Sequence, residues 1–120
     1  MMAAKKVTLF HNPRCSKSRK ALELLSGRDV DLEVLEYLSS APSRETIAGL
    51  IESSDSAPAE FVRSSDAAFK DAGLEMPERP TPEAVAALLA EHPAVLQRPI
   101  AVSGGVAVIG RPPERVLELL

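Results

Sequence analysis

Two short β-rich segments flank a helical segment near the start of the chain, and this pattern constrains the fold most. The first segment, residues 6–10 ("KVTLF"), is apolar and ends at His-Asn-Pro. From Ser16 onward, apolar residues recur at helical spacing, and Gly27 is the expected stop. The second β-rich segment, residues 32–37 ("LEVLEY"), alternates apolar and acidic residues. We therefore predict a βαβ unit with parallel strands and a right-handed connection.

The middle of the chain predicts helices. Ser43 and Thr81 are good N-caps, and a helical pattern follows each of them. The second of these helices should stop near His92, which precedes a proline and is expected to be a cap or a surface residue. Three further segments are expected between the two caps: short helices over residues 59–63 and 66–73, and a loop over residues 75–80.

The end of the chain returns to a β pattern. Residues 100–110 predict a hairpin around Ser-Gly-Gly, and residues 112–120 predict a last helix. The resulting order, β-α-β, several helices, then β-β-α, is thioredoxin-like. We therefore expect an α/β fold with a mixed four-stranded sheet and a helical insertion between its two halves. The length of the chain fits a single domain over residues 1–120.

Cys15 is the only cysteine, and it lies in the most basic stretch of the chain. The first 22 residues contain six Lys or Arg and no acid, whereas the other 98 contain eight basic and seventeen acidic residues. Cys15 follows the first strand and precedes the first helix, whose N-terminus offers unpaired N–H groups and about half a positive charge. Cysteines in such positions can have pKa values of about 3.5 to 7.5. The sequence thus predicts a thiolate in an anion site, against the alternatives of an inert buried cysteine and a solvated basic surface.

Three polar neighbours of Cys15 are candidate members of this site. Ser16 and Ser18 add hydroxyl donors. His11 either tunes the thiolate, as a positive neighbour or an orienting group, or only bonds to the loop backbone, and the sequence leaves both open.

Two motif comparisons restrict the chemistry of Cys15. A thiol phosphatase loop has arginine six residues after its cysteine, where this chain has Ala21. A dithiol redox motif has a second cysteine where this chain has Ser18. Any redox cycle must therefore use thiols from outside the protein. One cysteine and two distant histidines do not make a structural zinc site, so no metal is expected.

The composition argues against several classes of protein. A lone cysteine forms no internal disulfide, which favours a reducing, cytoplasmic setting. No apolar run approaches the roughly 20 residues of a membrane helix, and the first residues do not resemble a secretory signal. We expect no nucleic-acid partner, because the bulk of the chain is acidic and has only four aromatic residues for base stacking.

Four segments carry a resemblance to a known family: "HNPRCSKSR", "EYLSSAPSRETIAGLI", "QRPIAV" and "VIGRPPERVLELL". Together they resemble the glutaredoxin-coupled arsenate reductases. The resemblance implies that Cys15 attacks arsenate and that three arginines hold the oxyanion and the arsenylated intermediate. Residue by residue, these are Arg63, Arg98 and Arg111, and His11 matches the family histidine. It further implies glutathione as co-substrate, glutaredoxin as partner and no bound cofactor.

These assignments are chemically consistent. Arsenate is a tetrahedral dianion near neutral pH, and guanidinium groups pair with such oxygens in forks. Each arginine has the alternative of a surface ion pair, which for Arg63 would involve Glu60 or Asp66. The resemblance to thioredoxin-like folds, which have a cis bond at the matching place, implies that the bond between Arg98 and Pro99 is cis, although only about 5–6% of X-Pro bonds are. That geometry would turn Arg98 toward the loop of Cys15.

Two other functions suit the same fold. One is a monothiol oxidoreductase that acts on glutathione mixed disulfides, suggested by Cys-x-x-Ser. The other is a non-enzymatic transcriptional regulator, since a fold does not fix a function. Redox regulators of the related group usually carry Cys-x-x-Cys, which this chain lacks.

Overall fold

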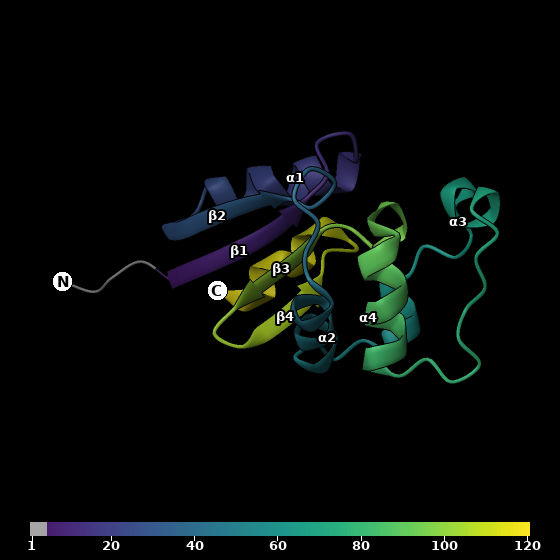
Figure 1. The fold of residues 1–120 in the computed structure, drawn as a ribbon. Helices are drawn as coiled ribbons and strands as arrows, with labels where there is room; N and C mark the ends of the chain where they lie inside the picture. The colour runs from purple at the N-terminus through teal and green to yellow at the C-terminus, as the bar shows by residue number, and fades with distance from the viewer. Residues whose placement is uncertain (1–4) are drawn as a thin grey trace.

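Four strands form one mixed sheet in the computed structural model, which describes residues 5–120 (Figure 1). β1 (Lys5–His11) lies between β2 (Val30–Glu36), with which it is parallel, and β3 (Ile100–Ser103), with which it is antiparallel. β4 (Val106–Ile109) pairs antiparallel with β3 at the far edge. The predicted thioredoxin-like α/β fold is confirmed. Residues 1–4, which belong to the predicted domain, lie outside the described residues.

Helices cover both faces of the sheet (Figure 1). Successive side chains of β1 point to opposite faces. Val7 and Leu9 pack with α1 (Ser16–Ser26) and the 3₁₀ helix η3 (Pro113–Leu119). Phe10 packs in the cluster beneath α2 (Arg44–Glu52) and α4 (Pro82–Glu91). These three side chains are at most 4% exposed, so β1 is the centre of the core. The helices are α1 (Ser16–Ser26), α2 (Arg44–Glu52), η1 (Pro58–Phe61), α3 (Ala67–Asp71), α4 (Pro82–Glu91), η2 (Pro93–Val95) and η3 (Pro113–Leu119).

The expected helix starts are confirmed. The Ser43 hydroxyl accepts the N–H of Thr46 at the start of α2, and the Thr81 hydroxyl accepts the N–H of Ala84 at the start of α4. α4 ends at its C-cap, His92. Within residues 5–120, no helix is long and apolar enough to cross a membrane.

The prediction of a helix over residues 59–63 is wrong in its second half. η1 ends at Phe61, and Val62 is extended and pairs antiparallel with Leu96. Both side chains are at most 5% exposed. The apolar pair thus gains burial against a distant segment, which local helical spacing does not reveal.

The C-terminal half contains the expected hairpin. Gly104 and Gly105 turn the chain between β3 and β4 with φ of 57° and 79°, which a two-residue turn of this hand requires. The last helix is present as the 3₁₀ helix η3. The bond between Arg98 and Pro99 is cis as predicted, and the bond between Arg111 and Pro112, which was not predicted, is cis as well.

Candidate active site

The strand register brings together three loops at the same end of the strands. Phe10, near the end of β1, pairs with Ile100 at the start of β3. Ile109, at the end of β4, pairs with the same Ile100. The loops that carry predicted site residues therefore meet: Cys15 after β1, Arg98 before β3 and Arg111 after β4.

Cys15 is the N-cap of α1, with an extended backbone. A tight turn precedes it, in which the N–H of Cys15 donates to the carbonyl of Asn12 at 3.0 Å. The side-chain oxygen of Asn12 accepts the N–H of Arg14, also at 3.0 Å. Asn12 is only 6% exposed, so the turn is held from the interior. The half-buried sulfur thus lies where the first N–H groups of the helix have no partner within the helix.

Cys15 is more acidic than an ordinary cysteine. Burial raises its pKa, but the N–H groups of Ser18 and Lys17 and the guanidinium of Arg98 outweigh burial and lower the pKa below its ordinary value. The helix start and one arginine therefore stabilise the thiolate together.

Ser18 faces the interior rather than the sulfur. It is fully buried, and its hydroxyl accepts the N–H of Asn12 at 3.0 Å and lies 2.6 Å from Nδ1 of His11. Burial lowers the pKa of His11 more than the carboxylate of Glu36 raises it, so the imidazole is neutral at pH 7. His11 thus braces the loop through Ser18 instead of supplying the positive charge considered from the sequence. The group of Ser18 that stabilises the thiolate is its backbone N–H.

Arg98 belongs to the segment before β3, and its guanidinium lies close to the Cys15 sulfur. Its backbone N–H donates to Oε1 of Gln97 at 3.2 Å, and its Nη1 donates to the carbonyl of Ala94 at 3.4 Å. Its Nε is buried and has no hydrogen-bond partner within residues 5–120. The guanidinium therefore has an unused donor close to the thiolate.

Tyr37, which follows β2, is a second polar neighbour of Arg98. Its side chain is fully buried, and its hydroxyl has no hydrogen-bond partner in the part of the chain that the structure describes. Burial raises the pKa of Tyr37 in spite of the nearby guanidinium of Arg98, so the phenol is neutral. It adds a polar group but no charge to this edge of the sheet.

Arg63 reaches the site through the pairing of Val62 with Leu96. Its Nε and Nη2 donate to Oδ2 of Asp66 at 3.2 and 3.1 Å, and its Nη1 donates to Oε1 of Gln97 at 3.1 Å. The ion pair with Asp66, an alternative noted from the sequence, is therefore present. Asp66 and Gln97 together fix the plane of the guanidinium.

Arg111 contacts the backbone of Arg98. Its Nε donates to the carbonyl of Arg98 at 2.9 Å. Burial lowers the pKa of Arg111, and the positive charges of Arg63 and Arg98 lower it further, while Cys15 opposes this. Three guanidinium groups and one thiolate thus interact with one another. Clustered positive charges of this kind favour a bound anion, because Asp66 alone compensates only one of them.

Cys15, Arg98 and Arg111 are brought together directly, Arg63 is joined to them through Gln97, and His11 and Ser18 support the loop of Cys15. Ser16 is the first residue of α1 and is exposed. Two contributing residues, Asn12 and Gln97, were missed. Each adjoins a predicted residue in the sequence, His11 and Arg98 respectively, and this was the available signal. Within residues 5–120, no group of three His, Cys, Asp or Glu side chains is placed to hold a metal ion.

Comparison with known proteins places this geometry in a family. Residues 10–119 match the model of the ArsC family. The chain belongs to the ArsC family. An arsenate reductase of Neisseria meningitidis is 38% identical over 115 residues, which cover 95% of this chain and 97% of that protein. The Escherichia coli protein YfgD, whose name states no activity, is also 38% identical, over 97% of this chain and 98% of its own.

A solved structure of an ArsC relative agrees with the fold throughout its length. The arsenate reductase of Vibrio cholerae superposes with a TM-score of 0.86 at 37% identity, over 98% of this chain and 99% of that one. The helical insertion and the C-terminal ββα unit are therefore shared with this relative.

Proposed function

We propose that this protein reduces arsenate to arsenite with Cys15 as the nucleophile. The observation that carries the proposal is the convergence of Arg98 and Arg111 on a thiolate at the N-terminus of α1. A thiolate that attacks a dianion meets like-charge repulsion, and this cationic site offsets it. Relatives that match nearly the whole chain are named arsenate reductases, which supports arsenate as the substrate.

In the first step, the Cys15 sulfur bonds to arsenic and one arsenate oxygen leaves. Two protons convert that oxygen to water, so arsenic stays pentavalent and no electrons are transferred. Arg98 and Arg111 hold the remaining oxygens, and Arg63 contributes from the far side of Gln97. Ser16 and the backbone N–H of Ser18 lie at the helix start, where such oxygens are favoured.

The electrons come from thiols outside the protein, because Cys15 is the only cysteine. A first glutathione replaces a second oxygen on arsenic and releases water. A second thiol attacks the sulfur of that glutathione, a disulfide leaves, and the electron pair stays on arsenic, which becomes trivalent. Water then releases arsenite and regenerates the Cys15 thiolate. In this proposal glutaredoxin assists the thiol exchanges, and the protein binds no cofactor. A reducing cytoplasm would keep the thiols in the reduced form that the cycle needs.

His11 acts in this proposal as a positioning residue. Its neutral ring accepts the hydroxyl proton of Ser18, and Ser18 holds Asn12. The loop thereby presents Cys15 at the helix start without a second ionising group.

The test is an arsenate reduction assay coupled to glutathione and glutaredoxin. Wild-type protein should turn over, and Cys15→Ser should not, because a serine hydroxyl is almost wholly protonated at neutral pH. Turnover above background by Cys15→Ser would refute the thiolate mechanism. A glutathione mixed disulfide is assayed in parallel. Activity on the disulfide alone would favour the monothiol oxidoreductase, and activity on neither substrate would favour the transcriptional regulator.

A further inference from the structure

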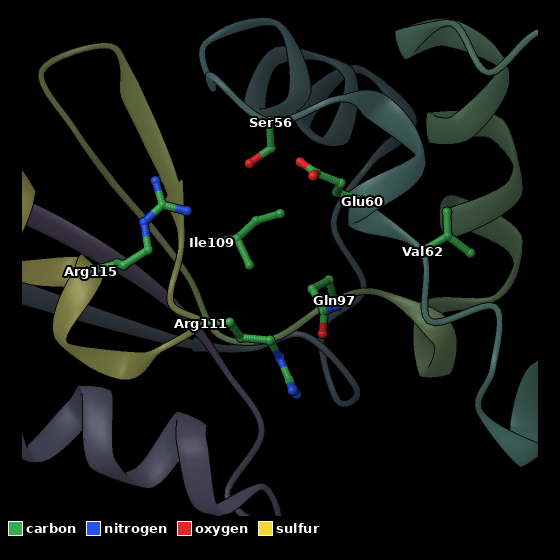
Figure 2. A pocket seen from close by; sticks show the side chains of 7 residues that line it. All are labelled: Ser56, Glu60, Val62, Gln97, Ile109, Arg111 and Arg115. Atoms are coloured by element: carbon green, nitrogen blue, oxygen red, sulfur yellow. The ribbon is translucent and has the colours of Figure 1, made fainter.

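A cavity of about 330 Å³ adjoins the arginine cluster, and Arg111 and Gln97 line it (Figure 2). Its volume falls at the lower end of the range of about 300–1,000 Å³ that small-molecule sites occupy. Gln97 has two roles at this boundary. Its Oε1 holds Arg63 and the N–H of Arg98, whereas its amide nitrogen has no hydrogen-bond partner within residues 5–120. One member of the arginine cluster, Arg111, is therefore part of the cavity wall.

Opposite charges face each other across the cavity (Figure 2). Arg115 enters from η3, and Glu60 and Ser56 enter from the segment around η1. Arg115 uses Nε for Glu118 at 3.3 Å, so its terminal nitrogens are available to a ligand. One oxygen of Glu60 accepts the N–H of Ala57 at 3.0 Å, and the other has no partner within the described chain.

The remaining lining is apolar. Ile109 lies between Arg115 and Glu60, and Val62 lies beyond Glu60 (Figure 2). A ligand that fits must therefore have a negative group for Arg115, a positive group for Glu60 and a less polar part between them. A short zwitterionic peptide has these features. A simple inorganic anion would leave the apolar wall and Glu60 unused.

A neighbouring cavity of about 220 Å³ shares Ser56 and Arg115 with the first cavity, and Asp55 and Glu118 also line it. Gln97 and Arg111 line the first of these two cavities but not the second. The first cavity is therefore the one of the two that adjoins the arginine cluster.

We propose that this cavity binds the peptide part of the thiol co-substrate, with a carboxylate on Arg115 and an ammonium group on Glu60. The inference rests on the proposed function, which requires an outside thiol to reach arsenic on Cys15. Arg111 lines the cavity and also interacts electrostatically with Cys15, so the cavity and the reacting centre share this residue. The site would prefer short peptide thiols over small uncharged thiols.

A kinetic experiment compares glutathione with 2-mercaptoethanol, which has neither a carboxylate nor an ammonium group. Arg115→Ala should raise the KM for glutathione about fivefold, or about 1 kcal/mol, and leave the KM for 2-mercaptoethanol unchanged. Glu60→Gln, which keeps an acceptor for Ala57, should raise the KM for glutathione about twofold. Arg44→Ala, which removes an exposed arginine at the start of α2, is the matched control and should change neither value.

A binding experiment decides the inference without catalysis. S-Methylglutathione has the same charges but no reactive thiol. It should cause saturable NMR shifts at Ser56, Gln97 and Arg115 in the wild type, with about fivefold weaker binding to Arg115→Ala. Equal effects of Arg115→Ala on both thiols, or no saturable shift at millimolar concentration, would overturn the inference. If the wild type reduces no arsenate with either thiol, the proposed function fails, and S-methylglutathione binding still decides the cavity assignment.

Discussion

Arg98→Ala is the substitution that tests the anion site most directly. The guanidinium of Arg98 lies beside the Cys15 thiolate, and its buried Nε has no partner within residues 5–120. A bound oxyanion would accept at least one hydrogen bond from this group. A hydrogen bond to a charged group contributes about 1.5–3 kcal/mol, so the substitution should weaken anion binding about 10- to 150-fold.

Arg14→Ala is the control for the loss of anion binding expected of Arg98→Ala. Arg14 lies in the same loop as Cys15, but its side chain is exposed and has no assigned contact with the anion. An exposed charge contributes less than about 1 kcal/mol, so its removal should weaken binding less than about fivefold. Arg98→Lys should recover only part of the loss, because an ammonium group supplies charge without the planar fork.

Protection of Cys15 from iodoacetamide measures anion binding in all three variants. Sulfate or arsenate should slow alkylation of the wild type by covering the sulfur, and the concentration for half protection gives the apparent affinity. The thermal unfolding midpoint shows whether a variant stays folded. The reasoning is refuted if saturating anion leaves the alkylation rate of the wild type unchanged, or if Arg14→Ala weakens protection as much as Arg98→Ala.

Three further outcomes follow from the structure. The alkylation rate of Cys15 should rise with pH through a midpoint below 9.0. The Cys15 thiolate should also add to the free energy of unfolding of the wild type, relative to Cys15→Ala. This added stability should be complete above pH 9.0 and should be lost as the pH falls through the lowered pKa, so a pH-independent difference between the two proteins would contradict it. Gln97→Ala should raise the KM for arsenate about fivefold, because Arg63 and the N–H of Arg98 lose a shared acceptor worth about 1 kcal/mol, and an unchanged KM would count against it. Leu25→Ala, in the fully buried stripe of α1, should cost about 3–5 kcal/mol in urea unfolding, whereas Leu38→Ala, at a half-exposed position, should cost under about 1 kcal/mol; similar losses would contradict the assigned core.

The sequence predicted the parts of this molecule that depend on local patterns. The β-rich segments, the apolar stripe of α1 and the two helix caps were visible because periodicity and capping act within a few residues. The position of Cys15 at a helix start followed from the same signals. The approach of Arg98 and Arg111 to Cys15 required the sheet order as well, and the resemblance to a known family supplied what local patterns could not.

Ser18 shows how a local signal can be misread. Its hydroxyl was predicted to be a donor in the anion site of Cys15, as was that of Ser16. Ser18 also precedes Ala21 by three residues and Leu25 by seven, so it extends the buried stripe of α1. A serine on a buried stripe needs an internal partner, and His11 and Asn12 provide it. The apolar spacing could have indicated that its backbone, and not its hydroxyl, faces the thiolate.

Arg63 illustrates the opposite case, in which no local signal exists. Its place depends on the pairing of Val62 with Leu96, two residues that are far apart in the sequence. A single bridge between two distant residues leaves no periodic pattern in the sequence. The helical spacing over residues 59–63 was therefore the only visible feature. The pairing places Arg63 opposite Val95 and within hydrogen-bond reach of Gln97, whose side chain joins it to the backbone of Arg98. The helical insertion therefore does more than cover one face of the sheet, since it supplies Arg63 and the acceptor, Gln97, that couples Arg63 to the backbone of Arg98.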